Sequence, residues 1–372
     1  MRIAFMHRSL GGGGTEADLC RMASGLVARG HEVHVFCAKP GTAPAGVAVH
    51  RVAIVRAGRV ARLLSFAIAA PRAVAREHWD VVVGFGRTLR QDVVRVGGGT
   101  HRTYLARMEA AGLRRRTRGP YHRAILWIEG RQFARDGHRR VLAVSARAGA
   151  EVTADYGVPP ERIAVVYNGV DLVRFHPANR AILGPAMRGA LGVPDGRPIC
   201  AAIGTGFERK GFDILLALWR DRAPRDSILV LVGDDERIGA FRRDTERPPL
   251  AGRAIVTGPR RDVEGILAAA DVVCVPSRQE AFGNVVLEAC AAGVPVVTSR
   301  LAGSAELLDG PLAGLVVDDP EDRPALSAAV ERALGAGRET FAQAARRLAE
   351  SLPWDTHVAR VEAELLRAAH AE

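Results

Sequence analysis

The segment of this chain richest in reactive side chains carries two glutamates, Glu280 and Glu288, in the run PSRQEAFGNVVLEA (276–289). The pattern predicts a strand ending near Val275, a loop carrying Glu280, and a helix beginning near Asn284, a good N-cap residue. Glu288 then lies on the same helix face as Asn284, about 6 Å farther along the axis. Carboxylates so placed can bind vicinal hydroxyls, one pair on a hexose and one on a ribose, beside helix N–H groups suited to a diphosphate.

A second loop carries two adjacent cations, Arg209 and Lys210, in the run GTGFERKGFD (204–213). It follows a predicted strand, Ile199–Ile203, and precedes a predicted helix. A diphosphate is well matched by an Arg fork for two oxygens and a Lys point charge beside it. The chain has only one other lysine, Lys39, so this one is notable among many arginines. The loop lacks the order of a Walker A motif, and an exposed basic loop is the alternative.

The loop of residues 9–15 contains Gly13 and Gly14 and lies between a predicted strand, Arg2–Met6, and a predicted helix, Glu16–Arg29. Glycines there let backbone N–H groups approach a phosphate at a helix N-terminus. The G-x-G-x-x-G dinucleotide motif is not matched, because no glycine follows at the required spacing. A flexible turn is therefore as good an interpretation of this loop taken alone.

The composition limits the class of protein in which these loops can lie. The chain has 372 residues, of which 48% are hydrophobic and 25% charged, so it is globular rather than disordered or fibrous. Its five cysteines show no C-x-x-C spacing, which favours buried thiols in a reducing cytosol over a zinc site or disulfides. No apolar run reaches the roughly 18 residues of a membrane span. We expect an intracellular protein of two domains.

Short apolar strands alternate with amphipathic helices in both halves of the chain, which predicts parallel sheets covered on both faces. We expect two doubly wound α/β domains facing each other across a cleft, with ligands bound beyond the carboxyl ends of the strands. The predicted N-terminal domain is 1–175, and the predicted C-terminal domain is 176–353. A last helix, 354–372, crosses back to the first domain. The predicted strands are Arg2–Met6, Glu32–Cys37, Val47–Val55, Asp80–Phe85, Val93–Val96, Val141–Val144, Arg162–Val166, Ile199–Ile203, Ile228–Val232, Ala254–Val256, Val272–Val275 and Val296–Thr298.

Positive charge is concentrated in one segment. The net charge is +11, and eleven arginines between Arg102 and Arg140, against three acidic residues, account for eight of those charges. Aromatic and aliphatic residues are interleaved at helical spacing. This pattern is typical of an interfacial helix on anionic lipid, but also of a nucleic-acid surface or of a solvated Arg-rich helix face.

Several motifs in order resemble one family. They are Gly13-Gly14 before the first helix, VYNGVD (166–171) followed by Arg174-Phe175, Arg209-Lys210-Gly211, and the E-x7-E pair Glu280 and Glu288. Over nearly its whole length the chain resembles the retaining glycosyltransferases of family 4, which have the GT-B fold. The resemblance implies that the N-terminal domain, 1–175, is the acceptor side and that the C-terminal domain, 176–353, binds the nucleotide-sugar. Within that family it is most similar to the lipopolysaccharide core glucosyltransferase I group, whose first helix and basic membrane-contacting segment have close counterparts here.

The resemblance assigns roles around the leaving group. It implies that Gly13 and Gly14, with Asp18, lie near the donor diphosphate and the transferred sugar. It implies that Arg209 and Lys210 hold the diphosphate and neutralise the charge that develops as the glycosidic bond breaks. These two cations would replace the divalent ion of other transferases, so no metal and no other cofactor is expected.

The resemblance also assigns the donor contacts. Glu280 would bind the hydroxyls of the donor sugar, and Glu288 would hold the ribose. The backbone N–H groups around Phe282, Gly283 and Asn284 would face sugar and phosphate.

Two further positions follow from the resemblance, and one departs from it. Arg174 matches a donor-binding position at the domain junction. The nucleobase would stack near residues 258–261, and Arg261 is the donor-binding candidate among them. Where the core glucosyltransferases carry an acidic residue, this chain has three glycines, 97–99, followed by Thr100 and His101. His101 is our candidate for a donor-sugar contact, with an acceptor contact or a helix cap as alternatives.

The predicted function is retaining transfer of a hexose, with glucose favoured, from a UDP-sugar to a membrane-bound glycolipid such as a lipopolysaccharide core or a related saccharide. The protein would be cytoplasmic and peripheral on the inner face of the cytoplasmic membrane, where the basic segment contacts anionic lipid. The residues expected to make that contact are Arg107, Arg114, Arg115, Arg116, Arg118, Arg123 and Trp127.

Two other functions stay open. A nucleotide-sugar epimerase would share the fold and act without an acceptor. A nucleic-acid-binding protein would use the Arg-rich segment, but no helix-turn-helix, zinc-finger or RNA-binding signature accompanies that charge, and the paired Glu280 and Glu288 would have no purpose in it. We expect no nucleic-acid partner.

Overall fold

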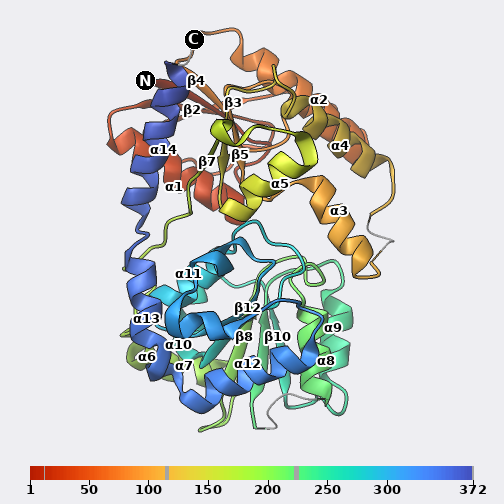
Figure 1. Cartoon of the computed structure of the whole chain (residues 1–372), viewed down its shortest axis with the longest axis vertical. Coiled ribbons are helices and arrows are strands. Elements are labelled where there is room, and N and C mark those ends of the chain that lie inside the picture. Colours follow the sequence, from red (N-terminus) through yellow and green to blue (C-terminus); the bar gives the residue numbers. More distant parts are fainter. Residues whose placement is uncertain (12, 114–116, 222–225, 371–372) are drawn as a thin grey trace. The chain divides into compact units, whose positions relative to one another are not determined.

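The computed structural model describes residues 1–11, 13–113, 117–221 and 226–370 (Figure 1). The chain divides into two compact units. Unit 1 comprises Met1–Asn168 together with Asp355–Glu372, and unit 2 comprises Gly169–Trp354. No helix of the described residues is both long enough and apolar enough to cross a bilayer.

Unit 1 is built on a seven-stranded parallel sheet with the strand order β3-β2-β1-β4-β5-β6-β7. This order starts in the middle of the sheet and winds outward in both directions, as in Rossmann-like domains. Its strands are β1 (Arg2–Met6), β2 (Glu32–Cys37), β3 (Val47–Arg51), β4 (Val81–Gly84), β5 (Val93–Val96), β6 (Arg140–Ala143) and β7 (Ile163–Val165). Its helices are α1 (Gly14–Ala28), α2 (Gly58–Val74), α3 (His101–Ala110), α4 (Pro120–Gln132), α5 (Ala146–Tyr156), the 3-10 helix η2 (Pro160–Arg162) and α14 (Trp354–Ala369).

Both faces of this sheet are covered, because the central strands are apolar on both sides. On one face Leu19 of α1 and Val361 of α14 are buried in a single core with Phe5 of β1. On the other face Phe66 of α2 packs with Met6 of β1. Helices α2 and α4 lie side by side on that second face (Figure 1). The last helix of the chain is thus part of the core of unit 1.

Unit 2 has a six-stranded parallel sheet in the order β10-β9-β8-β11-β12-β13, the same outward winding. Its strands are β8 (Ile199–Ile203), β9 (Ile228–Val232), β10 (Ala254–Gly258), β11 (Val272–Val275), β12 (Val296–Ser299) and β13 (Val316–Val317). Its helices are α6 (Asn179–Ile182), α7 (Gly184–Ala190), α8 (Phe212–Asp221), α9 (Ile238–Thr245), α10 (Val263–Ala269), α11 (Asn284–Ala291), η3 (Gly303–Leu307), η4 (Gly310–Leu315), α12 (Arg323–Ala336) and α13 (Arg338–Glu350).

The predicted doubly wound α/β class is confirmed in both units. Strands β1, β2, β5, β8, β9 and β11 have the predicted bounds. Strand β3 ends at Arg51, four residues short of the prediction, because the residues after it leave the sheet to form a loop. Strand β13 was not predicted, since Val316–Val317 is too short to give a periodic signal.

Candidate active site

The two cations of the predicted loop 204–213 converge on one carboxylate in unit 2. Arg209 and Lys210 lie between β8 and α8, and Glu280 lies after β11, the neighbouring strand in the sheet. The Arg209 Nη1 donates to Glu280 Oε2 at 3.0 Å and to the Gln279 carbonyl at 2.9 Å. The Lys210 ammonium forms an ion pair with the same Glu280 oxygen. The structure therefore brings together three of the residues predicted to act on the donor.

Burial sharpens the electrostatics of this cluster. Lys210 is only 8% exposed, and this desolvation lowers its pKa, while Glu280 acts in the opposite direction. Burial by itself would raise the pKa of Glu280, but the opposing charges of Lys210 and Arg209 bring it down to about 2. Glu280 is therefore a carboxylate at neutral pH, able to accept hydrogen bonds from hydroxyls.

Glu288 completes the predicted set. It lies one turn inside α11 and is partly buried. Its negative charge acts to raise the pKa of Lys210, against the larger effect of burial, so Glu288 is within electrostatic reach of the cluster. The helix begins at Asn284, as predicted, but its N-cap is Gly283 rather than Asn284. The reason is the backbone: Gly283 has φ +97°, a left-handed conformation that favours glycine.

The loop that carries Glu280 is fixed by backbone contacts to the segment after β12. The Gly303 N–H donates to the Glu280 carbonyl at 2.9 Å, and the Ser304 N–H donates to the carbonyl of Phe282 at 2.9 Å. Phe282 is itself buried, with 2% exposure. Phe282 thus anchors the loop through its ring and carbonyl, while Gly283 and Asn284 form the turn into α11.

Arg278, which we did not predict as a site residue, joins the two loops. Its guanidinium binds both carboxylate oxygens of Asp213 at 2.7 and 2.8 Å, and its Nε binds Glu321 at 2.6 Å. Burial alone would lower the pKa of Arg278, but Asp213 and Glu321 raise it overall. The backbone N–H of Arg278 donates to the Arg209 carbonyl at 2.9 Å. Gly211 allows the two loops to approach, since a Cβ there would lie 2.1 Å from the Pro276 carbonyl oxygen.

The two predicted donor-binding arginines elsewhere in unit 2 are neighbours. Arg174 donates through Nε and Nη2 to Glu264 at 2.9 and 2.7 Å, and through Nη2 to the backbone carbonyl of Arg261 at 2.7 Å. The guanidinium of Arg174 also lies over the ring of Phe175, 5.0 Å from its centre. Arg261 itself is exposed. Arg174 therefore holds the loop after β10 in place.

In unit 1 the glycine loop leads to a buried polar chain. Gly13 is the N-cap of α1, and Gly14 is its first residue. Asp18, 7% exposed, accepts a hydrogen bond from Asn168 Nδ2 at 3.3 Å, and Asn168 Oδ1 accepts one from Arg95 at 2.6 Å. Desolvation lowers the pKa of Arg95 and the charge of Asp18 opposes this shift. Asp18 is thus paired within the core of unit 1.

His101, the candidate for a sugar contact, is held by hydrogen bonds within unit 1. It is the first residue of α3, follows the N-cap Thr100, and is 6% exposed. Its backbone N–H donates to both oxygens of Glu129 at 3.0 and 2.9 Å, and its Nε2 lies 2.9 Å from His122 Nδ1. Burial, followed by the charges of Arg87 and His122, lowers the pKa of His101 to about 3. The ring is therefore neutral at physiological pH.

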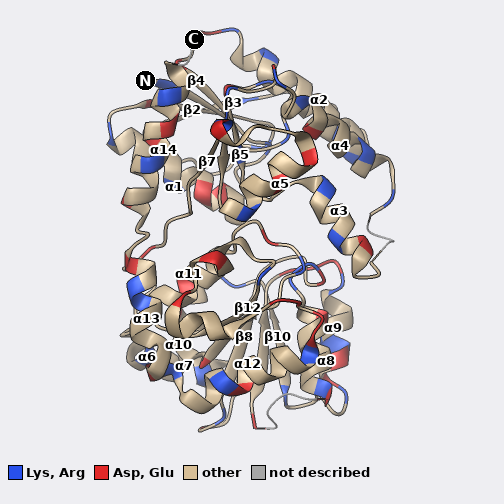
Figure 2. Ribbon diagram, viewed as in Figure 1, with Lys and Arg blue, Asp and Glu red and all other residues tan. Residues whose placement is uncertain are grey.

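The basic segment forms α3 and α4, and Figure 2 marks basic positions along both helices. Arg118 and Arg123 are exposed, and Trp127 is 46% exposed. Arg107 is instead paired with the buried carboxylate of Glu151 at 2.8 Å. Arg114, Arg115 and Arg116 lie outside the described residues.

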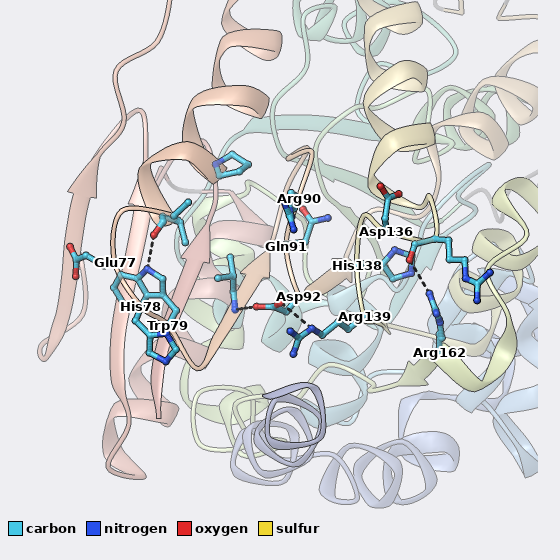
Figure 3. Close-up of a pocket in the computed structure, with 15 residues that line it drawn as sticks. Glu77, His78, Trp79, Arg90, Gln91, Asp92, Asp136, His138, Arg139 and Arg162 are labelled. Atoms are coloured by element: carbon cyan, nitrogen blue, oxygen red, sulfur yellow. Dashed lines mark hydrogen bonds and ion pairs between the residues drawn. The ribbon is translucent and has the colours of Figure 1, made fainter. Parts of the chain in front are cut away.

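Unit 1 also contains hollows. One of about 230 Å³ lies beyond the carboxyl ends of β1, β4 and β5 and is lined by residues that include His7, Arg87, Arg95 and Glu129. A larger one, of about 680 Å³, lies at the opposite edge of the sheet, before β4, β5 and β6 (Figure 3). Its charged groups are partly paired with each other, as Asp92 is with Arg139 at 3.4 Å. None of the predicted site residues is among those that line this larger hollow.

The described residues hold no group of three or more His, Cys, Asp or Glu side chains arranged to bind a metal ion. The polar residues that the predictions missed are Arg278, Arg95 and Glu129. Arg95 carried a usable signal, because a charge inside the apolar run VVRV (93–96) needs a buried partner.

Two family models match successive parts of the chain. The model described as Glycosyltransferase Family 4 matches residues 12–174, and the model described as Glycosyl transferases group 1 matches residues 197–336. Together they include all the predicted site residues, from Gly13 to Glu288.

Curated relatives agree with these models. A D-inositol 3-phosphate glycosyltransferase of Saccharomonospora viridis is 34% identical over 235 residues, which is 56% of this chain and 54% of that protein. The lipopolysaccharide glucosyltransferase WaaG of Escherichia coli (strain K12) is 25% identical over 362 residues, 94% of this chain and 95% of WaaG. The chain thus spans about half the length of the D-inositol 3-phosphate relative and nearly all of WaaG.

Solved structures share the fold. The crystal structure of WaaG, a glycosyltransferase involved in lipopolysaccharide biosynthesis, matches with a TM-score of 0.82 and 24% identity over 96% of this chain and 98% of that one. Anabaena Alr3699/HepE in complex with UDP-glucose matches with a TM-score of 0.74 and 20% identity over 99% of this chain and 100% of that one. The resemblance found in the sequence is confirmed: this chain has the GT-B fold and belongs to glycosyltransferase family 4.

Proposed function

We propose that this protein is a retaining glycosyltransferase that moves glucose from a UDP-sugar to a membrane-bound glycolipid acceptor, such as a lipopolysaccharide core or a related saccharide. The observation that carries the proposal is the convergence of Arg209 and Lys210 on Glu280 in unit 2. Two adjacent cations and an ionised carboxylate match a sugar diphosphate, because the cations suit the phosphates and the carboxylate suits the sugar hydroxyls.

In the proposed reaction Arg209 and Lys210 stabilise the charge that grows on the UDP diphosphate as the bond to the sugar breaks. Lys210 is nearly shielded from water. Its attraction to the charge that develops on the diphosphate is therefore stronger than it would be in bulk water. Glu280 holds the sugar hydroxyls, Glu288 holds the ribose, and the N-terminus of α11 faces the phosphates. The leaving phosphate oxygen accepts the proton of the attacking hydroxyl on the same face. The two cations do the work of a metal, so the reaction needs none.

The relatives support the choice of donor more strongly than the choice of acceptor. WaaG, by its name a lipopolysaccharide glucosyltransferase, aligns along nearly the whole chain. HepE was solved with UDP-glucose. Other curated relatives are named for D-inositol 3-phosphate, but the chain spans only about half of their length. We therefore propose UDP-glucose as donor and a lipid-linked saccharide as acceptor.

Calorimetric titration with UDP, GDP and ADP in EDTA tests the donor site. We expect UDP to bind in the micromolar range, and Glu288→Ala to weaken that binding about tenfold, the size of one hydrogen bond to a charged group. Glu246→Ala removes an exposed carboxylate at the C-terminal end of α9 and serves as the matched control. Preferential binding of GDP or ADP would overturn the UDP assignment, and no effect of Glu288→Ala would remove its ribose role.

Two assays separate the rival functions. An epimerase would convert UDP-glucose with no acceptor present, whereas we expect no conversion until a lipid-linked saccharide is added. A nucleic-acid-binding protein would bind DNA with strong salt dependence, and that binding would be indifferent to UDP-glucose. We expect such binding to be absent at physiological salt.

The exposed part of the basic segment supports a peripheral position on the inner face of the cytoplasmic membrane. Arg118 and Arg123 are exposed beside Trp127, an arrangement that suits anionic headgroups and the interface below them. Replacement of Arg118 and Arg123 by Ser should weaken binding to vesicles that contain phosphatidylglycerol. Unchanged vesicle binding would exclude this surface as the docking site.

A further inference from the structure

A hollow of about 570 Å³ in unit 1 is lined by five cations. Its volume falls within the range of about 300–1,000 Å³ that is usual for ligand pockets. No carboxylate is among the described residues that line it. We call it the basic pocket, and its charged residues are Arg8, Lys39, Arg51, Arg56 and Arg62.

The basic pocket lies beyond the carboxyl ends of the first three strands. Arg8 follows the end of β1 by two residues, Lys39 follows the end of β2 by two residues, and Arg51 is the last residue of β3. Arg56 lies in the loop after β3, and Arg62 is in α2. Ligands of parallel sheets bind at this edge. The loop that contains Arg8 also leads directly to the first turn of α1.

The backbone beneath these cations is tightly connected. The Ala38 and Lys39 N–H groups both donate to the Arg8 carbonyl at 3.1 Å, and the Leu10 N–H donates to the Lys39 carbonyl at 3.0 Å. Gly41 permits this approach, because a Cβ there would lie 1.9 Å from the Leu10 carbonyl oxygen. The backbone segments that carry Arg8 and Lys39 are therefore held at fixed positions relative to each other.

These cations also differ from most arginines of unit 1. Arg2, Arg29 and Arg107 each form an ion pair with a glutamate. In the described part of the chain, by contrast, none of the five cations of the basic pocket lies within 4 Å of a carboxylate. Like charges that share a pocket repel one another, so this arrangement opposes folding and favours the binding of a multiply charged anion.

We propose that the basic pocket binds the phosphate groups of the acceptor, so that this enzyme acts on a phosphorylated acceptor. The inference rests on the proposed function, because it assigns a chemical group to the acceptor of that reaction. A phosphate monoester or diphosphate presents several oxygens at once, which suits four Arg forks and one Lys ammonium. The phosphate belongs either to the saccharide itself or to a lipid headgroup.

The test compares two double variants by calorimetric titration with inorganic pyrophosphate, in saturating UDP so that Arg209 and Lys210 are occupied. Lys39→Gln with Arg51→Gln removes two charges from the basic pocket. Arg72→Gln with Arg76→Gln removes two exposed charges from the end of α2 and is the matched control. We expect the first pair to weaken pyrophosphate binding about tenfold or more, and the control pair to leave it unchanged. Equal binding by both variants, or none by the wild type, overturns the inference.

Two further arms identify the source of the phosphate. Titration with glucose 6-phosphate, with glucose as the neutral reference, reports on a phosphorylated saccharide. Sedimentation with phosphatidylcholine vesicles, with and without phosphatidic acid, reports on a lipid headgroup. Loss of one of these interactions in the Lys39→Gln, Arg51→Gln variant assigns the source, and loss of neither contradicts the inference.

The same experiments separate failure of this inference from failure of the proposed function. In titrations with UDP alone, we expect the wild type and both double variants to bind UDP with the same affinity. If UDP binds and the pyrophosphate result is negative, only the inference falls. If UDP does not bind, the proposed function falls, while pyrophosphate binding at the basic pocket is still measured. Removal of two repelling charges should leave the melting temperature unchanged or higher, so lost binding is not explained by unfolding.

Discussion

The two units have sheets of the same winding, yet they use the carboxyl ends of their strands differently. In unit 2 the charged side chains at this edge come from two loops after adjacent strands and meet in ion pairs, as Lys210 and Arg209 do with Glu280. In unit 1 the corresponding polar groups, such as Asp18 and Arg95, are buried in a hydrogen-bonded chain. The same topology thus supports an ionic cluster in one unit and a buried network in the other.

This difference between an ionic cluster and a buried network predicts which charged groups bind the ligand and which stabilise the fold. The ionic cluster of unit 2 offers charges that can exchange partners with an anionic ligand, because hydrogen bonds from Arg209 and Lys210 to a phosphate can replace those to Glu280. The buried groups of unit 1, by contrast, position the backbone, as Glu129 does for the N-terminus of α3. Substitutions in unit 2 should therefore change binding and rate, and those in the unit 1 network should change stability.

The largest effect is expected from Lys210→Met, which keeps the apolar stem and removes the ammonium. Under the proposed function, glucose transfer should fall about 10³-fold, because the variant lacks the charge assigned to the leaving diphosphate, a contribution worth about 4 kcal/mol in such sites. Steady-state kinetics and an unfolding curve measured together test this. A rate within about tenfold of the wild type, in a folded variant, would contradict the role of Lys210.

Arg278→Leu should have the next largest effect, and on stability first. The side chain is 5% exposed and joins Asp213, Glu321 and the Arg209 loop, so its loss should lower the free energy of unfolding by about 2–3 kcal/mol. The loss is smaller than for a fully buried ion pair, because water screens the two partly exposed carboxylates.

The second readout distinguishes positioning from bulk stability. UDP binding should weaken in Arg278→Leu at a temperature where the protein is folded, because Arg209 loses its backbone support. Arg278→Lys, which keeps one charge, should restore part of the affinity. Destabilisation with unchanged UDP affinity would show that Arg278 holds the fold but not the site.

His101 provides the corresponding test for unit 1, through pH. Its pKa is about 3 in the folded protein and near its usual 6.5 in the unfolded chain, so only the unfolded state takes up a proton between these values. Its contribution to stability is complete above about pH 6.5 and falls as the pH drops toward 3. At about pH 5 the loss amounts to about 2 kcal/mol.

His101→Gln should remove that part of the pH dependence. Denaturant unfolding at about pH 7.5 and pH 5 measures it as the difference between variant and wild type. His357, whose pKa is also lowered to about 3 by burial, is present in both proteins and cancels in the comparison. An identical pH dependence in the two proteins would mean that the pKa of His101 is the same in the folded and the unfolded state.

The sequence predicted unit 2 better than unit 1 for a physical reason. Arg209, Lys210, Glu280 and Glu288 belong to two short motifs, and adjacent parallel strands bring the ends of those motifs together. The spacing within each motif places its side chains on a loop after a strand, and the resemblance assigns both loops to one donor site. What it could not provide was Arg278, whose partner Asp213 becomes a neighbour only when the two loops pack.

In unit 1 the polar chain joins residues 18, 95 and 168, which only the sheet order brings together. No local pattern links such distant positions, so Asp18 was assigned to the donor by resemblance and its partner Arg95 was missed. The environment of His101 was equally hidden, because Glu129 and His122 come from another helix. Local spacing predicts sites built from loops after strands, and tertiary packing decides the buried ones.

The smallest predicted effect is a difference in vesicle binding between two arginines of the basic segment. Arg107 and Arg123 are both arginines expected to contact the membrane, but Arg107 is paired with Glu151 while Arg123 is exposed. Arg123→Ser should weaken binding to anionic vesicles by about 1 kcal/mol, roughly fivefold, with little change in stability. Arg107→Ser should leave vesicle binding nearly unchanged and destabilise unit 1, because Glu151 then stays buried without its main partner. Equal vesicle binding by the two variants would mean that membrane affinity follows net charge rather than exposure, and salt dependence would then be the same for every arginine in the segment.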